Sequence, residues 1–151
     1  MTDTPPFDVD AYLPEPNQIF VATNGPTIRP LWYQWEDGSF WIISGPWAKL
    51  FGRVQKDPKL ALLVDTCDLK SGRILQVMAS GPVEITPYDI PRARRMLHRY
   101  LGPDEASWSS EPDDYRGYLR GDGPPGATWL KIKPTTFKPF NFSFRDTAKP
   151  A

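Results

Sequence analysis

Proline is the feature that most constrains how this chain can fold. Eighteen of its 151 residues are proline, whereas the average share in proteins is about 5%. The prolines stand between apolar segments along the chain and do not gather into one tract. Because proline interrupts helices and the inner strands of sheets, this distribution predicts many short elements joined by turns. That pattern is typical of a β-rich fold.

Composition and charge exclude several classes of protein. Eighteen Lys and Arg balance eighteen Asp and Glu, so the basic excess that proteins use to bind nucleic acid or anionic membranes is missing. Aromatic residues make up 13% of the chain, which argues against disorder. No apolar run approaches the ~20 residues that span a bilayer, and the N-terminus lacks the features of a signal peptide. We therefore expect a cytoplasmic protein without nucleic-acid or membrane partners.

Apolar runs bounded by turn residues predict an antiparallel sheet. The pairs Asn24-Gly25 and Asp37-Gly38 are strong hairpin signals, so the first three predicted strands form a meander. A later strand contains Ser80-Gly81-Pro82, which predicts a bend or bulge. The expected strands are residues 19–23, 29–35, 39–44, 59–66, 73–86, 128–133 and 136–144.

Three other segments show helical features. Apolar residues recur at positions i, i+3, i+4 and i+7 within 47–54, the stripe of a short helix with Pro46 in its first turn. Residues 87–101 read as a longer amphipathic helix, and 111–119 as a further turn or two.

These elements define the expected fold class. It is mainly β (α+β), an antiparallel split β-barrel of about six or seven strands with two or three short helices, because closure removes the edge strands that an open sheet exposes. The barrel domain covers residues 19–145. An N-terminal arm, 1–18, precedes it, with Phe7 and Tyr12 laid against the body, and a C-terminal tail, 146–151, follows it.

Side chains for hydrolytic or metal chemistry are sparse. His98, the only histidine, sits among arginines and lacks an orienting carboxylate and a nucleophile, so we interpret it as solvated helix surface. Cys67, the only cysteine, falls in an expected turn without basic neighbours that would activate a thiolate. The pair Asp113-Asp114 is interpreted as solvent-facing charge. We expect no catalytic side chain and no metal site.

Residues 44–53 carry the most informative chemistry. A predicted strand runs there into a helix whose first turn offers free backbone N–H groups, the outline of an anion site. Ser44, at the end of the predicted strand, can donate a hydrogen bond from its hydroxyl. The cations Lys49, Arg53 and Lys56 recur along one side of the helix. The same spacing also fits an ordinary amphipathic helix with a solvated cationic side, and the residues alone leave both readings open.

Several short motifs follow one another in a characteristic order. They are Ala22-Thr23, then Arg29-Pro30-Leu31-Trp32-Tyr33-Gln34-Trp35-Glu36-Asp37-Gly38, then Ser44 to Lys49, Asp57-Pro58-Lys59-Leu60-Ala61-Leu62, Gly81-Pro82-Val83-Glu84-Ile85 and Trp129-Leu130-Lys131-Ile132-Lys133-Pro134. Through them, most of residues 19–144 resembles the pyridoxamine 5′-phosphate oxidase-like superfamily of split β-barrel flavoproteins. Within it the chain is most similar to the actinobacterial branch that uses the deazaflavin coenzyme F-420, although the spacing from Lys49 to Asp57 departs slightly from that branch.

The resemblance implies a function and an assembly. It implies an oxidoreductase in which reduced coenzyme F-420 transfers hydride to a small organic acceptor, within a groove between the two barrels of a homodimer. The cofactor carries the hydride chemistry, so no catalytic side chain is needed. The residues implied for cofactor binding are Pro30, Trp32, Ser44, Gly45, Pro46, Trp47, Lys49, Arg53 and Trp129, the last contributed by the partner chain.

Two alternatives stay open beside this function. One is an FMN-binding oxidase or reductase, or a haem-related member of the same superfamily; the other is a non-catalytic carrier of cofactor or ligand. A terminal phosphate monoester, as in FMN, carries about −1.5 to −2 charges and needs several cations. The internal diester of the deazaflavin carries about half that charge, which Lys49 and backbone N–H groups can satisfy. Its carboxylate tail would then need Lys56 or the arginines of 92–99.

The tryptophans have structural readings as well. We expect Trp35 or Trp41 to lie in the barrel core, because strand alternation sends neighbouring residues to opposite faces. Trp47 can either wall the cofactor groove or plug the core beneath its helix. We favour the wall, because Leu50, Phe51 and Val54 can anchor that helix without it.

Overall fold

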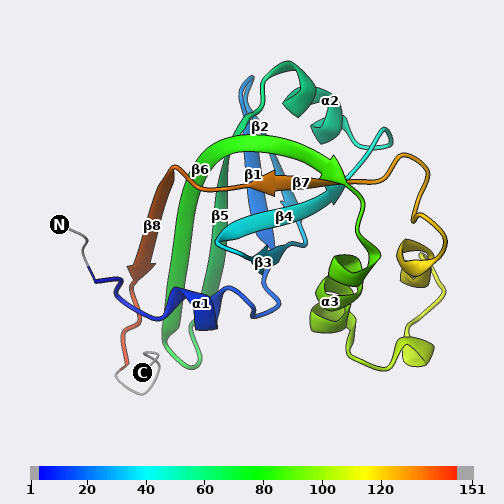
Figure 1. Ribbon diagram of the computed structural model, residues 1–151. Coiled ribbons are helices and arrows are strands. Elements are labelled where there is room, and N and C mark those ends of the chain that lie inside the picture. Colours follow the sequence, from blue (N-terminus) through cyan, green and yellow to red (C-terminus); the bar gives the residue numbers. More distant parts are fainter. Residues whose placement is uncertain (1–3, 146–151) are drawn as a thin grey trace.

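The computed structural model describes residues 4–145 and is built around a strongly curved antiparallel sheet (Figure 1). The strand order is β2-β1-β5-β6-β7-β4-β3, with β8 paired to β6. The strands are β1 (Ile19–Thr23), β2 (Thr27–Leu31), β3 (Gln34–Glu36), β4 (Ser39–Ser44), β5 (Lys59–Asp68), β6 (Arg73–Pro87), β7 (Thr128–Ile132) and β8 (Thr136–Asn141). The expected mainly β, antiparallel split barrel is confirmed, with eight strands where six or seven were predicted.

Short helices surround the sheet. They are α1 (Val9–Tyr12), α2 (Lys49–Lys56), α3 (Ile90–Leu101) and the 3-10 helices η1 (Glu105–Ser107) and η2 (Tyr115–Leu119). In Figure 1, α2 and α3 lie at different ends of the curved sheet. The sequence predicted Pro46 in the first turn of its helix. Helix α2 instead begins at Lys49, so Pro46 lies in the turn that precedes it. No helix within residues 4–145 is long and apolar enough to cross a membrane.

The second expected strand is divided in two. Strand β2 pairs with β1, whereas β3 pairs with β4 at the opposite end of the strand order. The two predicted turns, at Asn24-Gly25 and Asp37-Gly38, both exist. Between them the chain passes from one end of the strand order to the other, so the prediction of a continuous three-stranded meander was wrong. Tyr33, at the break, is fully buried and donates its hydroxyl to the carbonyl of Leu13 at 2.6 Å. Burial of the Tyr33 ring in the core stabilises the fold more than continued strand pairing beyond Leu31 would.

Strand β6 joins the two parts of the barrel. Along one edge it pairs first with β8, over Leu75–Ser80, and then with β7, over Val83–Pro87. The change of partner falls at Gly81, where the sequence predicted a bend. A Cβ at this position would lie 2.7 Å from the carbonyl oxygen of Lys133. Glycine therefore permits a close backbone approach that any side chain would obstruct.

Two apolar clusters form the core. The larger fills the barrel and includes Phe7, Tyr12 and Leu13, so residues 4–18 pack into the body as the sequence suggested for Phe7 and Tyr12. The smaller lies beneath α3 and contains Trp41, so this tryptophan is buried but not in the barrel, while Trp35 packs partly buried against the barrel cluster. The expected C-terminal tail, 146–151, lies outside the described residues.

Arginines tie α3 to the barrel. Arg92 and Arg95 both bind Glu36, at 3.3 and 2.7 Å. Burial works to raise the pKa of Glu36, but hydrogen bonds from Arg95 and Gln34 outweigh it and hold the pKa below its usual range. Arg99 donates to the side chain of Gln34 and to four backbone carbonyls, those of Leu13, Pro14, Glu15 and Tyr33.

His98 is not the solvated side chain expected from the sequence. Its Nε2 lies 2.7 Å from Oε2 of Glu105, and its ring meets Trp108 edge-on. Arg94 donates to the same carboxylate at 2.8 Å. Sequence analysis missed Glu105 as the partner of His98. Gly102, at a positive φ of 93°, ends α3 and turns the chain back, which brings Glu105 beside the helix. These contacts fasten η1 to the end of α3.

Two further interpretations need adjustment. Cys67 is exposed and lies within β5, not in the turn expected from the sequence. Asp114 is the N-cap of η2 and accepts hydrogen bonds from the backbone N–H and the guanidinium of Arg116, so it has a structural role beyond surface charge. Within residues 4–145, no group of three or more His, Cys, Asp and Glu side chains is placed to hold a metal ion.

Alanine substitutions at two glycines test the close backbone approach between Gly81 and Lys133. We expect Gly81→Ala to lower the free energy of unfolding by about 1–3 kcal/mol, the usual cost of overpacking. Gly52→Ala is the matched control, since nothing lies within 4 Å of its Cβ position in α2 and alanine is about 1 kcal/mol more favourable than glycine inside a helix. Urea denaturation should move the two midpoints in opposite directions. A Gly81→Ala protein as stable as its parent would contradict the close approach.

Candidate functional site

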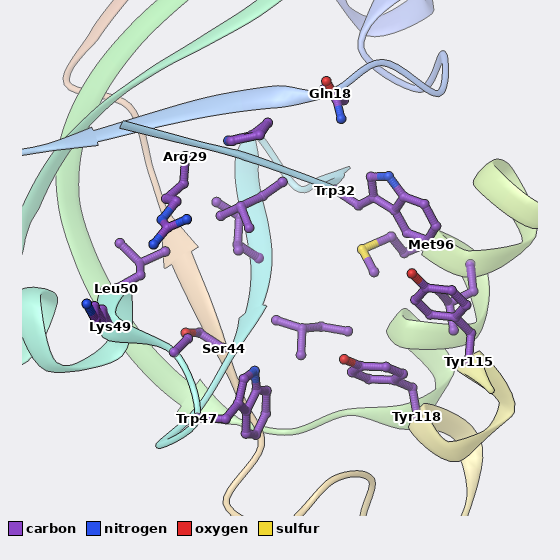
Figure 2. A pocket seen from close by; sticks show the side chains of 16 residues that line it. Gln18, Arg29, Trp32, Ser44, Trp47, Lys49, Leu50, Met96, Tyr115 and Tyr118 are labelled. Atoms are coloured by element: carbon purple, nitrogen blue, oxygen red, sulfur yellow. The ribbon is translucent and has the colours of Figure 1, made fainter. Parts of the chain in front are cut away.

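A cavity of about 650 Å³ lies between β2, β4, α2, α3 and η2 (Figure 2). Side chains from five separate elements reach it, so it exists only in the folded chain. Its size is typical of small-molecule sites, which combine an apolar lining with a few polar groups. The two ends of the cavity differ in chemistry.

One end of the cavity is cationic. Arg29 reaches it from β2 and Lys49 from the first turn of α2 (Figure 2). Within the part of the chain that the structure describes, neither forms an ion pair with a carboxylate. Cations without a partner favour binding of an anionic group.

Ser44 adds a buried polar group beside these cations. It ends β4, is 1% exposed, and its Oγ has no hydrogen-bond partner. The backbone of Ser44 is fixed by β7, since Thr128 Oγ1 donates to its carbonyl at 2.9 Å. An unsatisfied buried hydroxyl costs about 1–3 kcal/mol. A ligand that bonds to this oxygen would recover that free energy.

The start of α2 is also uncapped. Its N-cap residue is Ala48, and no side chain accepts a hydrogen bond from the first turn. Free N–H groups and the helix dipole make such an end a site for anions. With Ser44, Lys49 and Arg29, it gives the cavity several donors toward a negative group.

The other end of the cavity is aromatic. The ring of Trp32 lies 5.2 Å from that of Tyr115, which stacks on Tyr118 at 6.1 Å. The two tyrosines are three residues apart in η2, and a 3-10 helix places such residues on one face. Burial, with contributions from Tyr115 and Asp113, raises the pKa of Tyr118, so its hydroxyl stays protonated at neutral pH. These rings give this end of the cavity an aromatic lining suited to a conjugated ring system.

Trp47 walls the cavity and is 50% exposed, in agreement with the position favoured from the sequence. Its ring lies across the backbone of Gly45, where a Cβ would overlap the indole. Pro46 packs against Gly126, since a Cβ there would lie 2.8 Å from Pro46 Cδ. Gly45 and Pro46 therefore shape the turn that presents Trp47.

The structure brings together only part of the site expected from the sequence. The cavity is lined by Pro30, Trp32, Ser44, Trp47 and Lys49. The lining does not include Gly45, Pro46, Arg53 or Trp129.

Trp129 differs most from its expected role. It is 0% exposed, and its Nε1–H donates to the carbonyl of Asp89 at 3.1 Å. Its ring also stacks on Tyr88, with centroids 6.1 Å apart. It is therefore a core residue of its own chain and does not reach a groove on another.

Sequence reasoning missed several lining residues. Arg29 immediately precedes Pro30 in the motif that carried the resemblance, so its position on the same strand was a usable signal. The spacing of Tyr115 and Tyr118 also predicts a shared face, once the segment is known to be a 3-10 helix. Met96 had no such signal, because helical periodicity assigns it to a buried face without saying what it faces.

Comparisons with known proteins bear on the fold. A scan against models of protein families finds no match, and a search of curated proteins finds none. Among solved structures, a conserved hypothetical protein of Mycobacterium tuberculosis, Rv2991, has a TM-score of 0.67 at 16% identity, covering 100% of this chain and 95% of that one. An F420 reductase has a TM-score of 0.60 at 20% identity, with 85% and 94% covered. The heme storage protein HutZ of Vibrio cholerae has a TM-score of 0.62 at 10% identity, with 88% and 91% covered.

At such low identities the likeness to solved structures establishes the fold alone. The shared fold is the split β-barrel that the sequence analysis predicted.

Replacing Trp47 and Trp129 by phenylalanine makes the same chemical change at a cavity wall and in the core. We expect Trp47→Phe to change the free energy of unfolding by no more than about 0.5 kcal/mol, as at exposed positions generally. Trp129→Phe should cost about 1–3 kcal/mol, because it leaves unfilled space in the core and removes one of the two donors to the carbonyl of Asp89. Denaturant unfolding measures both. Equal losses would assign Trp47 to the core.

Proposed function

We propose that this protein is an oxidoreductase that binds a flavin-type cofactor, foremost the deazaflavin coenzyme F-420, in this cavity. The observation that carries the proposal is the unpartnered buried hydroxyl of Ser44, next to the uncapped start of α2 and to Lys49. Anion donors at one end and an aromatic lining at the other match a cofactor with a phosphate and a conjugated ring. The fold shared with an F420 reductase supports the same choice.

Five of the lining residues have a stated role in this proposal. Ser44, Lys49 and the first N–H groups of α2 hold the phosphodiester, while Trp32 and Trp47 flank the ring. Arg29 takes the carboxylate tail. When bound, the cofactor supplies the hydride that passes to a small organic acceptor, and the protein binds it, orients it and excludes water.

The distribution of free cations favours the deazaflavin over FMN. The arginines of α3, which the sequence offered for the tail, are bonded to Glu36, to Glu105 and to backbone carbonyls. At the cavity this leaves Arg29 and Lys49. A phosphate monoester with about −1.5 to −2 charges needs several cations. A diester carries about half that charge, so that Lys49 can serve it while Arg29 serves the carboxylate.

A haem-related function has less support. His98, the only histidine of the chain, is bonded to Glu105 and does not line the cavity, although histidine is a common axial ligand of haem iron. A cofactor carrier without turnover remains the second candidate, because no lining residue is required to act as an acid or a base.

Titration of the purified protein with F-420 and, separately, with FMN tests the site. We expect F-420 to bind more tightly, and Ser44→Ala and Lys49→Ala each to weaken its binding by about 1.5–3 kcal/mol, the range for hydrogen bonds to charged groups. Without ligand, Ser44→Ala should leave stability unchanged or raise it, because its hydroxyl has no partner to lose. Lys56→Ala, on the same helix but outside the cavity, is the matched control.

Other outcomes of this titration separate the alternatives. Unchanged affinity in both variants would place the ligand elsewhere. Tight binding of FMN alone would replace the deazaflavin by a flavin. Binding of reduced F-420 without turnover on a panel of small organic acceptors would make the protein a carrier.

We also propose that the chain forms a homodimer through the outer face of its sheet. Pro30, Phe20, Leu63 and Met78 are paired in register across β2, β1, β5 and β6 and so share that face. Met78 is 49% exposed. Near this row, Oδ1 of Asp65 is buried without a partner. A second copy related by a two-fold axis would cover the row with the same row, and Pro30 connects this face to the cavity.

Analytical ultracentrifugation tests this assembly. We expect a dimer at micromolar concentration, and Met78→Lys should shift it toward monomer by burying an unpaired charge. Leu69→Lys is the control, because Leu69 is 66% exposed on the β5–β6 turn, away from that row. A monomer at every concentration of the unaltered chain would exclude the homodimer.

A further inference from the structure

Trp32 lies where the chain leaves the sheet. Strand β2 ends at Leu31 and β3 begins at Gln34, so Trp32 has no partner in either ladder. Strand pairing normally fixes the direction of a side chain, and here it is missing. Trp32 nevertheless points toward the cavity (Figure 2), so contacts from outside the sheet must orient it.

Tyr100, on α3, makes those contacts. Its ring stacks on the indole of Trp32, with centroids 4.5 Å apart and planes 5° from parallel. Its hydroxyl donates to the carbonyl of Asn17 at 2.6 Å and accepts the backbone N–H of Tyr33 at 3.3 Å. Tyr100 therefore holds both the ring of Trp32 and the peptide that follows it, although it does not itself line the cavity.

The neighbouring residue of α3 completes the support. Arg99 donates to the carbonyl of Tyr33 at 2.6 Å, so both backbone polar groups of Tyr33 are bonded to α3. The contact of Trp32 with Tyr115 is looser, at 5.2 Å and 30°. The Tyr100 stack is thus the closest and most parallel aromatic contact that Trp32 makes among residues 4–145.

We infer that Tyr100 is a positioning residue that acts through Trp32. It holds the indole plane in the orientation that meets the flat part of the ligand, and so lowers the cost of ordering this wall when the ligand binds. The identity of the ligand rests on the proposed function, whereas the orientation of Trp32 by Tyr100 does not.

A double-mutant cycle on ligand affinity tests this role. The variants are Trp32→Leu, Tyr100→Leu and the two combined, titrated with F-420 and with FMN. We expect each single variant to bind about tenfold more weakly, the loss produced by one aromatic contact. The double variant should bind no more weakly than Trp32→Leu, because Tyr100 acts through that residue. Independent, additive losses would overturn the inference.

Two further variants separate positioning from general stability. Tyr100→Phe keeps the stack and should retain more affinity than Tyr100→Leu. If the leucine variant does not fold, a Tyr100→Phe protein that binds as weakly as Trp32→Leu would still contradict the role of the stack. Tyr12→Phe is the matched control, since this buried phenol is bonded to Thr66 and lies in the larger core. It should lower the thermal midpoint without changing affinity. An equal loss of affinity in Tyr12→Phe would reduce Tyr100 to a purely structural residue.

Near-ultraviolet circular dichroism, measured on the same variants without ligand, is a second test of the orienting role. It reports fixed packing of aromatic rings, so Tyr100→Leu should remove the contribution that Trp32→Leu removes, and Tyr12→Phe should keep it. If the unaltered protein binds neither cofactor while this signal is lost in both variants, the proposed function fails and the orienting role stands. If a cofactor binds but both cycles are additive, the orienting role fails and the proposed function stands.

Discussion

Backbone polar groups that leave a sheet need other partners, and those of Tyr33 find them on α3. Arg99 and Tyr100 take its carbonyl and its N–H, and the buried ring of Tyr33 fills the barrel. With this break satisfied, β2 and β3 can stand at opposite ends of the strand order. The cavity is lined from β2, β4, α2, α3 and η2, so both its location and the direction of Trp32 depend on how the break is held.

The fold also divides the cations into two sets. On α3, the arginines are bonded to carboxylates and carbonyls, and Glu36 alone receives two of them. At the cavity, Arg29 and Lys49 have no such partner among residues 4–145, and the buried hydroxyl of Ser44 is unbonded within the same range. Arg29 and Lys49 are exposed to water, but a chain optimised for stability alone would not leave the buried hydroxyl of Ser44 unsatisfied. Their position at one end of one cavity supports the proposed binding site.

Local patterns predicted much of this arrangement. Alternation and turn residues located the strands of the barrel, and Ser80-Gly81-Pro82 marked the point where β6 changes partner. The segment from Ser44 to Lys49 was recognised as a strand end followed by an open helix start, and it lies in the cavity. These features depend on neighbours a few residues apart, which is why a sequence can display them.

The sequence by itself determined the antiparallel β class, the turn that presents Trp47 and the cationic start of α2. Only the tertiary structure decided that residues 29–35 split at Trp32, that Trp129 belongs to the core, and that the arginines of α3 serve the fold while Arg29 stays free. The reason is physical. Periodicity records which face of an element is apolar, whereas the partner of a charge or a ring is set by contacts across tens of residues, such as the 66 that separate Tyr33 from Arg99.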